Sequence, residues 1–228
     1  STYSHAEATA TTFQTYTITD SDTTGTYTCT LAGDDAADFT ASISGKVCTV
    51  VWAAAPNYDS AADDGGNNVY DITLAFSDGT NDLAAQTTAV TVTDTNDQTP
   101  AVSVASTYSH AEATATTFQT YTITDSDTTG TYTCTLAGDD AADFTASISG
   151  KVCTVVWAAA PNYESPTDDD TDNVYDITIA FSDGTNDLTA QTTAVTVTDV
   201  NDQTPAVSVA STYSHAEATA TTFQTYTI

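Results

Sequence analysis

The chain has 228 residues, of which 31 are Asp or Glu and only two are Lys or Arg, so its formal net charge is −29. A negative charge of this size repels nucleic acid and anionic lipid, which excludes functions that need a basic surface. It also predicts strong self-repulsion in a compact fold unless cations are bound, although a solvated acidic surface is an alternative. The sequence contains no long apolar run, so we expect no membrane insertion by this segment.

The sequence repeats itself with a period of 105 residues, because the 18-residue segment STYSHAEATATTFQTYTI begins at Ser1, Ser106 and Ser211 without a change. Residues 1–100 and 106–205 differ at nine positions, most of them in a single loop. A fixed period without insertions is typical of a tandem array of structural units. Recent duplication without functional meaning is the alternative.

The period sets the expected domain boundaries. We expect one repeat over 1–99 that lacks its first few residues, a complete repeat over 100–204, and the N-terminal strands of a third, truncated repeat over 205–228. The chain is therefore interpreted as a segment of a longer tandem array.

Short runs in which apolar residues alternate with Thr or Ser predict seven β-strands in the complete repeat and no helix. Turn-forming sequences, such as Asp-Thr-Thr-Gly at 127–130 and Ser-Asp-Gly-Thr-Asn at 182–186, separate these runs. This pattern in about 100 residues predicts an all-β fold, with tandem seven-stranded antiparallel Greek-key β-sandwiches joined end to end. In chain order the predicted strands are 101–104, 118–123, 131–136, 144–147, 152–157, 174–181 and 192–197.

Two of these strands carry the clearest inward-facing residues. Alternation places Tyr132, Cys134 and Leu136 on the inner face of one sheet. It places Cys153, Val155 and Trp157 on the inner face of the other.

Each full repeat contains two cysteines, Cys29 with Cys48 and Cys134 with Cys153. A zinc site would need ligands close in sequence, such as Cys-x-x-Cys, and the chain has none. We expect a disulfide in each repeat that joins one sheet to the other, which implies an oxidising compartment. Two buried free thiols per repeat remain the alternative.

Acidic motifs recur in the same order in each repeat. In the second repeat they read Ala-Glu112-Ala, Asp125-Ser-Asp127, Pro161-Asn-Tyr-Glu164, Phe-Ser-Asp183-Gly and Asp199-Val-Asn201-Asp202-Gln-Thr-Pro. A single Asp-x-Asp or Asp-Gly is not specific, but the order, the spacing and the terminal Pro together resemble the cadherin repeat, especially its bacterial cadherin-like form. The resemblance covers the entire chain. It implies calcium-binding linkers, with about two or three Ca²⁺ ions between consecutive repeats.

The resemblance also implies which residues bind these ions. Ca²⁺ takes about six to eight oxygen ligands, and an extended linker can present neighbouring side chains to the domains on both sides. For the first junction the implied ligands are Glu7, Asp59, Asp94, Asn96, Asp97, Asp125, Asp127 and Asp183, with the carbonyl groups of Thr95 and Gln98. For the second junction they are Glu112, Glu164, Asp199, Asn201 and Asp202, while Asp20, Asp22 and Asp78 would face a preceding repeat.

The chain departs from the family pattern in two places. Asn57 and Asn162 stand where the family commonly has Asp, which removes a charge from the outermost ion and predicts that this ion is weak or absent. Gln98 and Gln203 replace an Asn that acts through its backbone carbonyl, so little should change. Acidic runs outside the pattern are either solvated loop tips or sites for extra ions: Asp34-Asp35, Asp63-Asp64 and residues 168–172.

The sequence shows no arrangement typical of catalysis. His5, His110 and His215 recur once per repeat with no adjacent nucleophile pattern, so we expect packing or surface roles for them. Identical repeats also offer no distinct cleft for a pair of catalytic carboxylates. We therefore expect no enzymatic activity.

The preferred hypothesis is a calcium-rigidified extracellular stalk or filament on a microbial cell surface, part of a large adhesin. Its first partners would be neighbouring repeats of the same chain, joined through calcium. One alternative is that the repeats are themselves the adhesive or ligand-binding modules. Another is homotypic assembly of the chains into an extracellular fibre.

Overall fold

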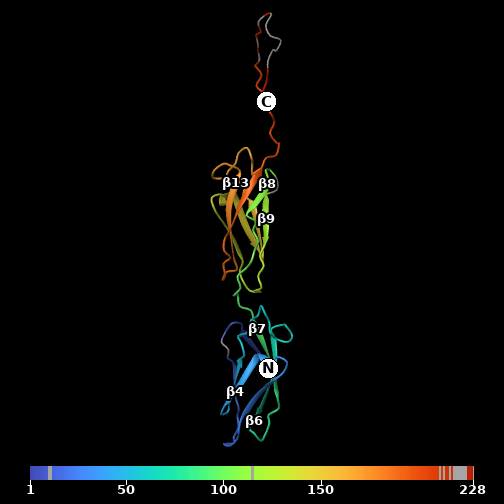
Figure 1. Ribbon diagram of the computed structural model, residues 1–228, viewed down its shortest axis with the longest axis vertical. Coiled ribbons are helices and arrows are strands. Elements are labelled where there is room, and N and C mark those ends of the chain that lie inside the picture. Colours follow the sequence, from blue (N-terminus) through green and yellow to red (C-terminus); the bar gives the residue numbers. More distant parts are fainter. Residues whose placement is uncertain are drawn as a thin grey trace.

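The computed structural model describes residues 1–9, 12–113, 116–210, 212, 214–215, 217 and 225–227. These residues form two β-sandwich domains that lie one beyond the other along the long axis of the molecule (Figure 1). We call them repeat 1 and repeat 2. In this described part of the chain, no helix is long and apolar enough to cross a membrane.

Repeat 1 contains seven strands and one short 3-10 helix among its described residues. The strands are β1 (Thr2–Ala6), β2 (Thr12–Thr17), β3 (Thr28–Ala32), β4 (Phe39–Ser44), β5 (Val47–Trp52), β6 (Val69–Ser77) and β7 (Gln86–Thr93), with η1 (Ala36–Asp38) before β4.

Repeat 2 has the same elements in the same order. They are β8 (Thr107–Ala111), β9 (Thr117–Thr122), β10 (Thr133–Ala137), η2 (Ala141–Asp143), β11 (Phe144–Ser149), β12 (Val152–Trp157), β13 (Val174–Ser182) and β14 (Gln191–Thr198). The all-β prediction and six of the seven predicted strands are confirmed, with ends that match or differ by at most two residues.

Each sandwich consists of a four-stranded and a three-stranded sheet. In repeat 2 the orders are β10-β13-β14-β8 and β11-β12-β9, and repeat 1 matches them. Neighbouring strands are antiparallel except at one edge, where β8 pairs with β14, and β1 with β7, in parallel. The fully antiparallel expectation was therefore wrong for this pair. The chain enters a repeat at one end and leaves at the other, so its first and last strands run in the same direction, and here they are neighbours.

The predicted strand at 101–104 is also wrong. Of these residues only Ala101 pairs, in an isolated bridge with Thr124, while the first regular strand is β8. Val102 and Val104 pack against the core of repeat 2, so their alternation with polar residues reflects packing rather than a hydrogen-bonded ladder.

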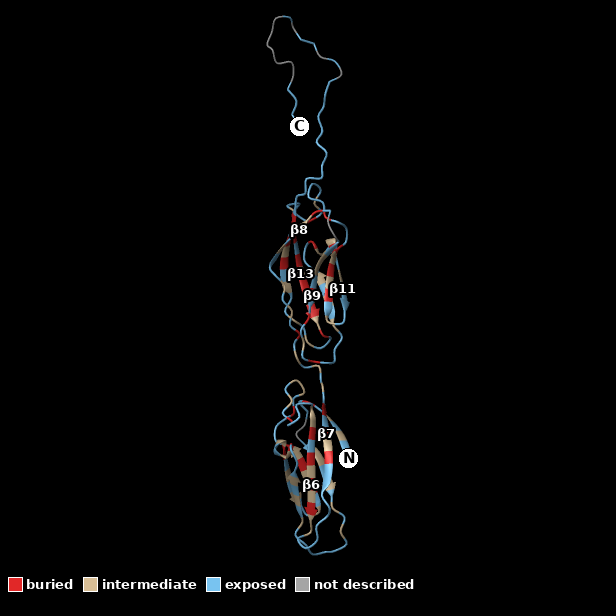
Figure 2. Cartoon of the chain, turned by 90° about the vertical axis from the view of Figure 1, so that its right-hand side faces the viewer, coloured by how far each residue is buried: buried red, intermediate tan, exposed pale blue. Residues whose placement is uncertain are grey.

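Buried residues lie mainly on the strands of both sheets (Figure 2), and those of repeat 2 form one hydrophobic core cluster. In repeat 2 the ring of Trp157 packs with centroid distances of 4.2 Å to Phe144 and 4.9 Å to Tyr175. The His110 ring lies 5.5 Å from that of Trp157, which agrees with a packing role for this histidine. Aromatic pairs in these geometries stabilise the core beyond their buried area.

A disulfide joins the two sheets of each repeat. Cys29 on β3 is bonded to Cys48 on β5, and Cys134 on β10 to Cys153 on β12, so both predicted pairs are confirmed and none of the four cysteines is free. In the chain-entropy model, closing a loop of about 20 residues contributes roughly 3 kcal/mol.

The expected strands of a third repeat fall largely on residues outside the described part of the chain. The described residues 202–210 form no strand.

Candidate metal centre

The two repeats meet at a junction that we call the seam, formed by linker residues 94–100 and the loops of both repeats that contact it. Hydrogen bonds fix the linker to repeat 2. The backbone N–H of Gln98 donates to Asp127 Oδ2 at 2.9 Å, and that of Thr128 donates to Asp94 Oδ2 at 2.6 Å. The side chain of Asn96 is hydrogen-bonded to the Asp183 carbonyl group and to Asn186.

Three groups of carboxylates overlap at the seam. The ligand oxygens within each group lie within 4.8 Å of one another, and the groups are Glu7/Asp59/Asp97, Asp59/Asp94/Asp127 and Asp125/Asp127/Asp183. Asp59 and Asp127 each belong to two groups, so the three groups form one continuous series. Repeat 1, the linker and repeat 2 all contribute to it, which means that no single repeat contains the complete set.

Several of these carboxylate oxygens are buried without a hydrogen-bond partner: both oxygens of Asp59, Oδ1 of Asp94 and Oδ1 of Asp127. Buried polar atoms are nearly always hydrogen-bonded, and an unpaired buried carboxylate is costly. Burial raises the pKa of Asp127, and the negative charges of Asp125, Asp59 and Asp94 raise it further, against a hydrogen bond from Gln98 that lowers it. A bound cation would give the unpartnered oxygens a partner and would offset the repulsion among the carboxylates.

The donor set favours a hard cation. The three seam groups contain only carboxylates, without His or Cys, and oxygen ligands of irregular geometry suit Ca²⁺ rather than Zn²⁺ or Cu²⁺. These residues therefore fit the ion that the sequence predicts. When bound, Ca²⁺ would supply the positive charge that the acidic seam lacks.

Glu7 connects three segments around the seam. It is only 1% exposed, and its carboxylate accepts backbone N–H groups from Tyr58 at 2.6 Å and Thr95 at 2.7 Å. Glu112 repeats this arrangement in repeat 2, where hydrogen bonds from Val200 and then Tyr163 lower its pKa. Each glutamate thus fixes a loop and a linker while its remaining lone pairs stay available to a cation.

The chain's two lysines have a role that the sequence did not suggest. Lys151 Nζ donates to the carbonyl oxygens of Asp125 at 2.8 Å and Asp127 at 3.1 Å, and it lies 5.3 Å from the centre of the Tyr132 ring. The Tyr132 hydroxyl donates to Asp125 Oδ2 at 2.9 Å. Lys46 makes the equivalent contacts in repeat 1. The only sign of this role in the sequence was that one lysine recurs at the same position in each repeat.

Asp183 is fully buried at the end of β13. Burial alone would raise its pKa, but hydrogen bonds from Asn186 and Thr185 outweigh that effect and leave the pKa lowered. Its Oδ1 accepts the backbone N–H groups of Thr185 and Asn186, both at 2.7 Å. The turn after β13 therefore keeps this carboxylate ionised and oriented.

The other implied ligands also lie in acidic groups. Glu112, Glu164 and Asp199 converge at the far end of repeat 2, and Asp20, Asp22 and Asp78 at the opposite end of repeat 1. The negative charge of Asp202 contributes to raising the pKa of Glu164, after desolvation and Glu112. The carboxamide oxygens of Asn57 and Asn162 instead accept local backbone N–H groups, from Ser60 and Ser165.

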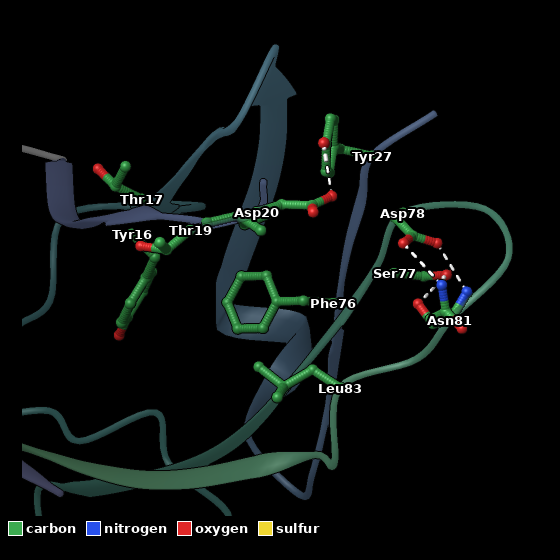
Figure 3. Close-up of a pocket in the computed structure, with 11 residues that line it drawn as sticks. Tyr16, Thr17, Thr19, Asp20, Tyr27, Phe76, Ser77, Asp78, Asn81 and Leu83 are labelled. Atoms are coloured by element: carbon green, nitrogen blue, oxygen red, sulfur yellow. Dashed lines mark hydrogen bonds between the residues drawn. The ribbon is translucent and has the colours of Figure 1, made fainter. Parts of the chain in front are cut away.

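Repeat 1 also has a groove of about 460 Å³ at the end remote from the seam (Figure 3). Its apolar lining includes Tyr16, Phe76 and Leu83, whose counterparts in repeat 2 are Tyr121, Phe181 and Leu188. In repeat 2, Val102 and Val104 pack against the core cluster that includes Tyr121 and Phe181, and Ala101 pairs with Thr124.

No family model matches the sequence, and a search of curated proteins found no match either. Solved structures do match the fold. Human Protocadherin-24 EC1-2 aligns with a TM-score of 0.64 at 17% identity, covering 87% of this chain and 94% of that one. For mouse Cadherin-23 EC22-24 the TM-score is 0.64 at 19% identity, with 88% and 64% covered.

The extracellular cadherin domains 3-6 of Protocadherin Gamma B2 align with a TM-score of 0.60 at 18% identity, over 90% of this chain. The chain spans about half the length of that structure, 47%. Identities this low show the fold alone. The chain therefore has a cadherin-like fold of two tandem β-sandwich domains, with acidic groups gathered at their junction.

Proposed function

We propose that this chain is a segment of a calcium-stiffened extracellular rod on a cell surface, within a larger adhesin. The observation that carries the proposal is the set of unpartnered carboxylate oxygens at the seam, which come from Asp59, Asp94 and Asp127. These residues belong to repeat 1, the linker and repeat 2 in turn. An ion bound by all three would tie both domains to one position.

Stiffness follows from the division of ligands between the repeats. Bending the linker would pull Asp59 of repeat 1 away from Asp127 of repeat 2, and a bound Ca²⁺ would lose part of its coordination shell. Without the ion, the same carboxylates repel one another across the seam. Calcium therefore converts an electrostatically repulsive joint into a rigid one.

The location is inferred from the cysteines and from the ion. Disulfides persist in oxidising compartments, and each described repeat has one that joins its two sheets. Extracellular modules bind Ca²⁺ with dissociation constants on the order of 10⁻⁴ to 10⁻³ M, which such a seam could match. The Protocadherin Gamma B2 domains that share this fold are extracellular cadherin domains.

A spacer role is favoured over recognition by the near identity of the two repeats. The differences lie mainly in one loop, 59–67 and 164–172, so most of the surface is the same in both. A rod needs the same joint at every repeat, whereas a recognition surface needs features that set one repeat apart from the others.

Small-angle scattering of the chain with calcium and with chelator tests the proposal. We expect a larger maximum dimension and a narrower distance distribution with calcium. At a calcium concentration just sufficient to saturate the unmodified chain, the variant Asp127→Asn should stiffen less, whereas Asp34→Asn, which removes the same charge from an exposed site outside the seam groups, should behave like the unmodified chain. Identical scattering with and without calcium would refute the rod.

A further inference from the structure

A second acidic site lies in the loop between β12 and β13 of repeat 2, outside the seam groups. There Asp168, Asp170 and Asp172 alternate with other residues. The counterparts in repeat 1 are Asp63, Gly65 and Asn67, so two carboxylates are present only in repeat 2. This loop is also where most differences between the repeats fall.

Asp168 carries the observation that points to a ligand. The residue is 3% exposed, its Oδ2 accepts the backbone N–H of Asp172 at 2.7 Å, and its Oδ1 is buried without a partner. In repeat 1 both oxygens of Asp63 are satisfied, by the N–H groups of Asn67 at 2.9 Å and Asn68 at 3.0 Å. The unsatisfied oxygen thus occurs in the repeat that has the extra carboxylates.

The geometry of repeat 1 shows where the side chain at position 170 begins. A Cβ added to Gly65 would lie 3.3 Å from Asp63 Oδ2 and 3.2 Å from Asn67 Nδ2. The side chain of Asp170 therefore starts between those of Asp168 and Asp172. In agreement, desolvation raises the pKa of Asp170, followed by the charge of Asp172 and the nearby Asp168 carboxylate.

Two acidic side chains that contact this loop already have partners. Asp140 accepts the backbone N–H groups of Asp169 at 2.8 Å and Asp176 at 2.6 Å, so it anchors the loop. Asp143 Oδ1 accepts the Thr167 hydroxyl at 2.7 Å. Among the three alternating aspartates, Asp172 Oδ1 also accepts a backbone N–H, from Val174 at 2.8 Å, so the buried oxygen that lacks a partner is Asp168 Oδ1.

We propose that Asp168, Asp170 and Asp172 bind an additional Ca²⁺ ion within repeat 2, separate from the seam. Carboxylates at alternate positions of a tight loop are a ligand arrangement that suits Ca²⁺, because it accepts several oxygens with flexible geometry. This ion would stabilise a loop inside one repeat and would leave the stiffness of the joint unchanged. Repeat 1, with Gly65 and Asn67, lacks the equivalent site.

Exchanging the loops between repeats tests the proposal with sequences that the chain already uses. The variant D170G/D172N gives repeat 2 the residues of repeat 1, and the reciprocal variant G65D/N67D gives repeat 1 the residues of repeat 2. In calorimetric titration of the full chain with CaCl₂, we expect one ion fewer for the first variant and one ion more for the second. Unchanged stoichiometry in both would overturn the site.

A measurement without substitutions separates this site from the seam. Amide NMR signals of residues 168–172 should shift during calcium titration of the unmodified chain. They should shift equally in Asp127→Asn, which damages only the seam. If these amides do not move when calcium is saturating, the loop binds no ion, whatever the seam does.

Discussion

The two carboxylate oxygens of Asp127 have different surroundings: Oδ2 accepts the backbone N–H of Gln98 at 2.9 Å, while Oδ1 is buried without a partner. One carboxylate thus both aligns the linker with repeat 2 and presents a free oxygen to two acidic groups. The position of repeat 2 relative to the linker and the binding of calcium are therefore coupled through a single side chain.

The first prediction concerns that coupling. Asp127→Asn keeps an oxygen that can accept the Gln98 N–H but removes a charge shared by two groups. We expect calcium affinity at the seam to fall by about tenfold or more, because ligand charge sets the affinity of such sites. Calorimetric titration measures the change, and circular dichroism should show both sandwiches intact. An affinity equal to that of Asp34→Asn would contradict the assignment.

Lys151 leads to a second prediction. Its ammonium group donates to the carbonyl groups of Asp125 and Asp127, so it positions the Asp-x-Asp loop. A protonated lysine has no free lone pair and is therefore not itself a calcium ligand. Lys151→Met retains much of the side-chain volume but removes these donors. We expect weaker calcium binding at the seam, with a smaller loss for Lys151→Arg, which restores donors.

The matched control for this prediction is Lys46→Met, because Lys46 makes the same contacts at the opposite end of repeat 1. That substitution should leave the seam unaffected. Equal loss of seam affinity in both lysine variants would contradict a local positioning role, and a general effect of net charge would instead strengthen calcium binding in both, because each variant loses a positive charge.

The fold could be predicted from the sequence wherever alternation of apolar residues and hydrogen-bonded pairing coincide. Residues 152–157 form a strand with the predicted ends, because every second residue there faces the core. Residues 101–104 alternate in the same way but pair at only one position. Alternation also gives no strand direction, which is why the parallel pairing of β8 with β14 was missed.

The candidate site, too, could be predicted only in part from the sequence. Motif order identified Asp59, Asp94 and Asp127, but it could not show which of their oxygens have partners. That property depends on how loops from both repeats pack around the linker. The difference between Asp63 and Asp168 was hidden for the same reason, because the two residues are identical in sequence and differ only in their hydrogen bonds.

A third prediction concerns acid stability without calcium. Backbone hydrogen bonds from Val200 and then Tyr163 lower the pKa of Glu112 from its ordinary value of 4.5. A lowered folded-state pKa contributes stability that is present above the ordinary value and is lost as pH falls through the lowered one. In chelator, the unmodified chain should therefore lose stability below about pH 4.5 more steeply than Glu112→Gln. Chemical denaturation across this range measures the slopes, and equal slopes would contradict the role of Glu112.

The last prediction separates the stability of a sandwich from the stiffness of the joint. The Cys134–Cys153 bond joins the two sheets of repeat 2, and the seam groups contain neither cysteine. Replacing both cysteines with Ala should lower the free energy of unfolding of repeat 2 by roughly 3 kcal/mol, because the unfolded chain regains loop entropy.

Since no seam ligand changes in that variant, calcium stoichiometry and the calcium-dependent scattering profile should remain those of the unmodified chain at temperatures where repeat 2 is folded. Differential scanning calorimetry with saturating calcium gives the stability, and scattering gives the shape. Loss of calcium-dependent stiffening in a folded Cys134→Ala/Cys153→Ala chain would show that the sandwich core also controls the joint. The seam carboxylates alone would then be insufficient to rigidify the rod.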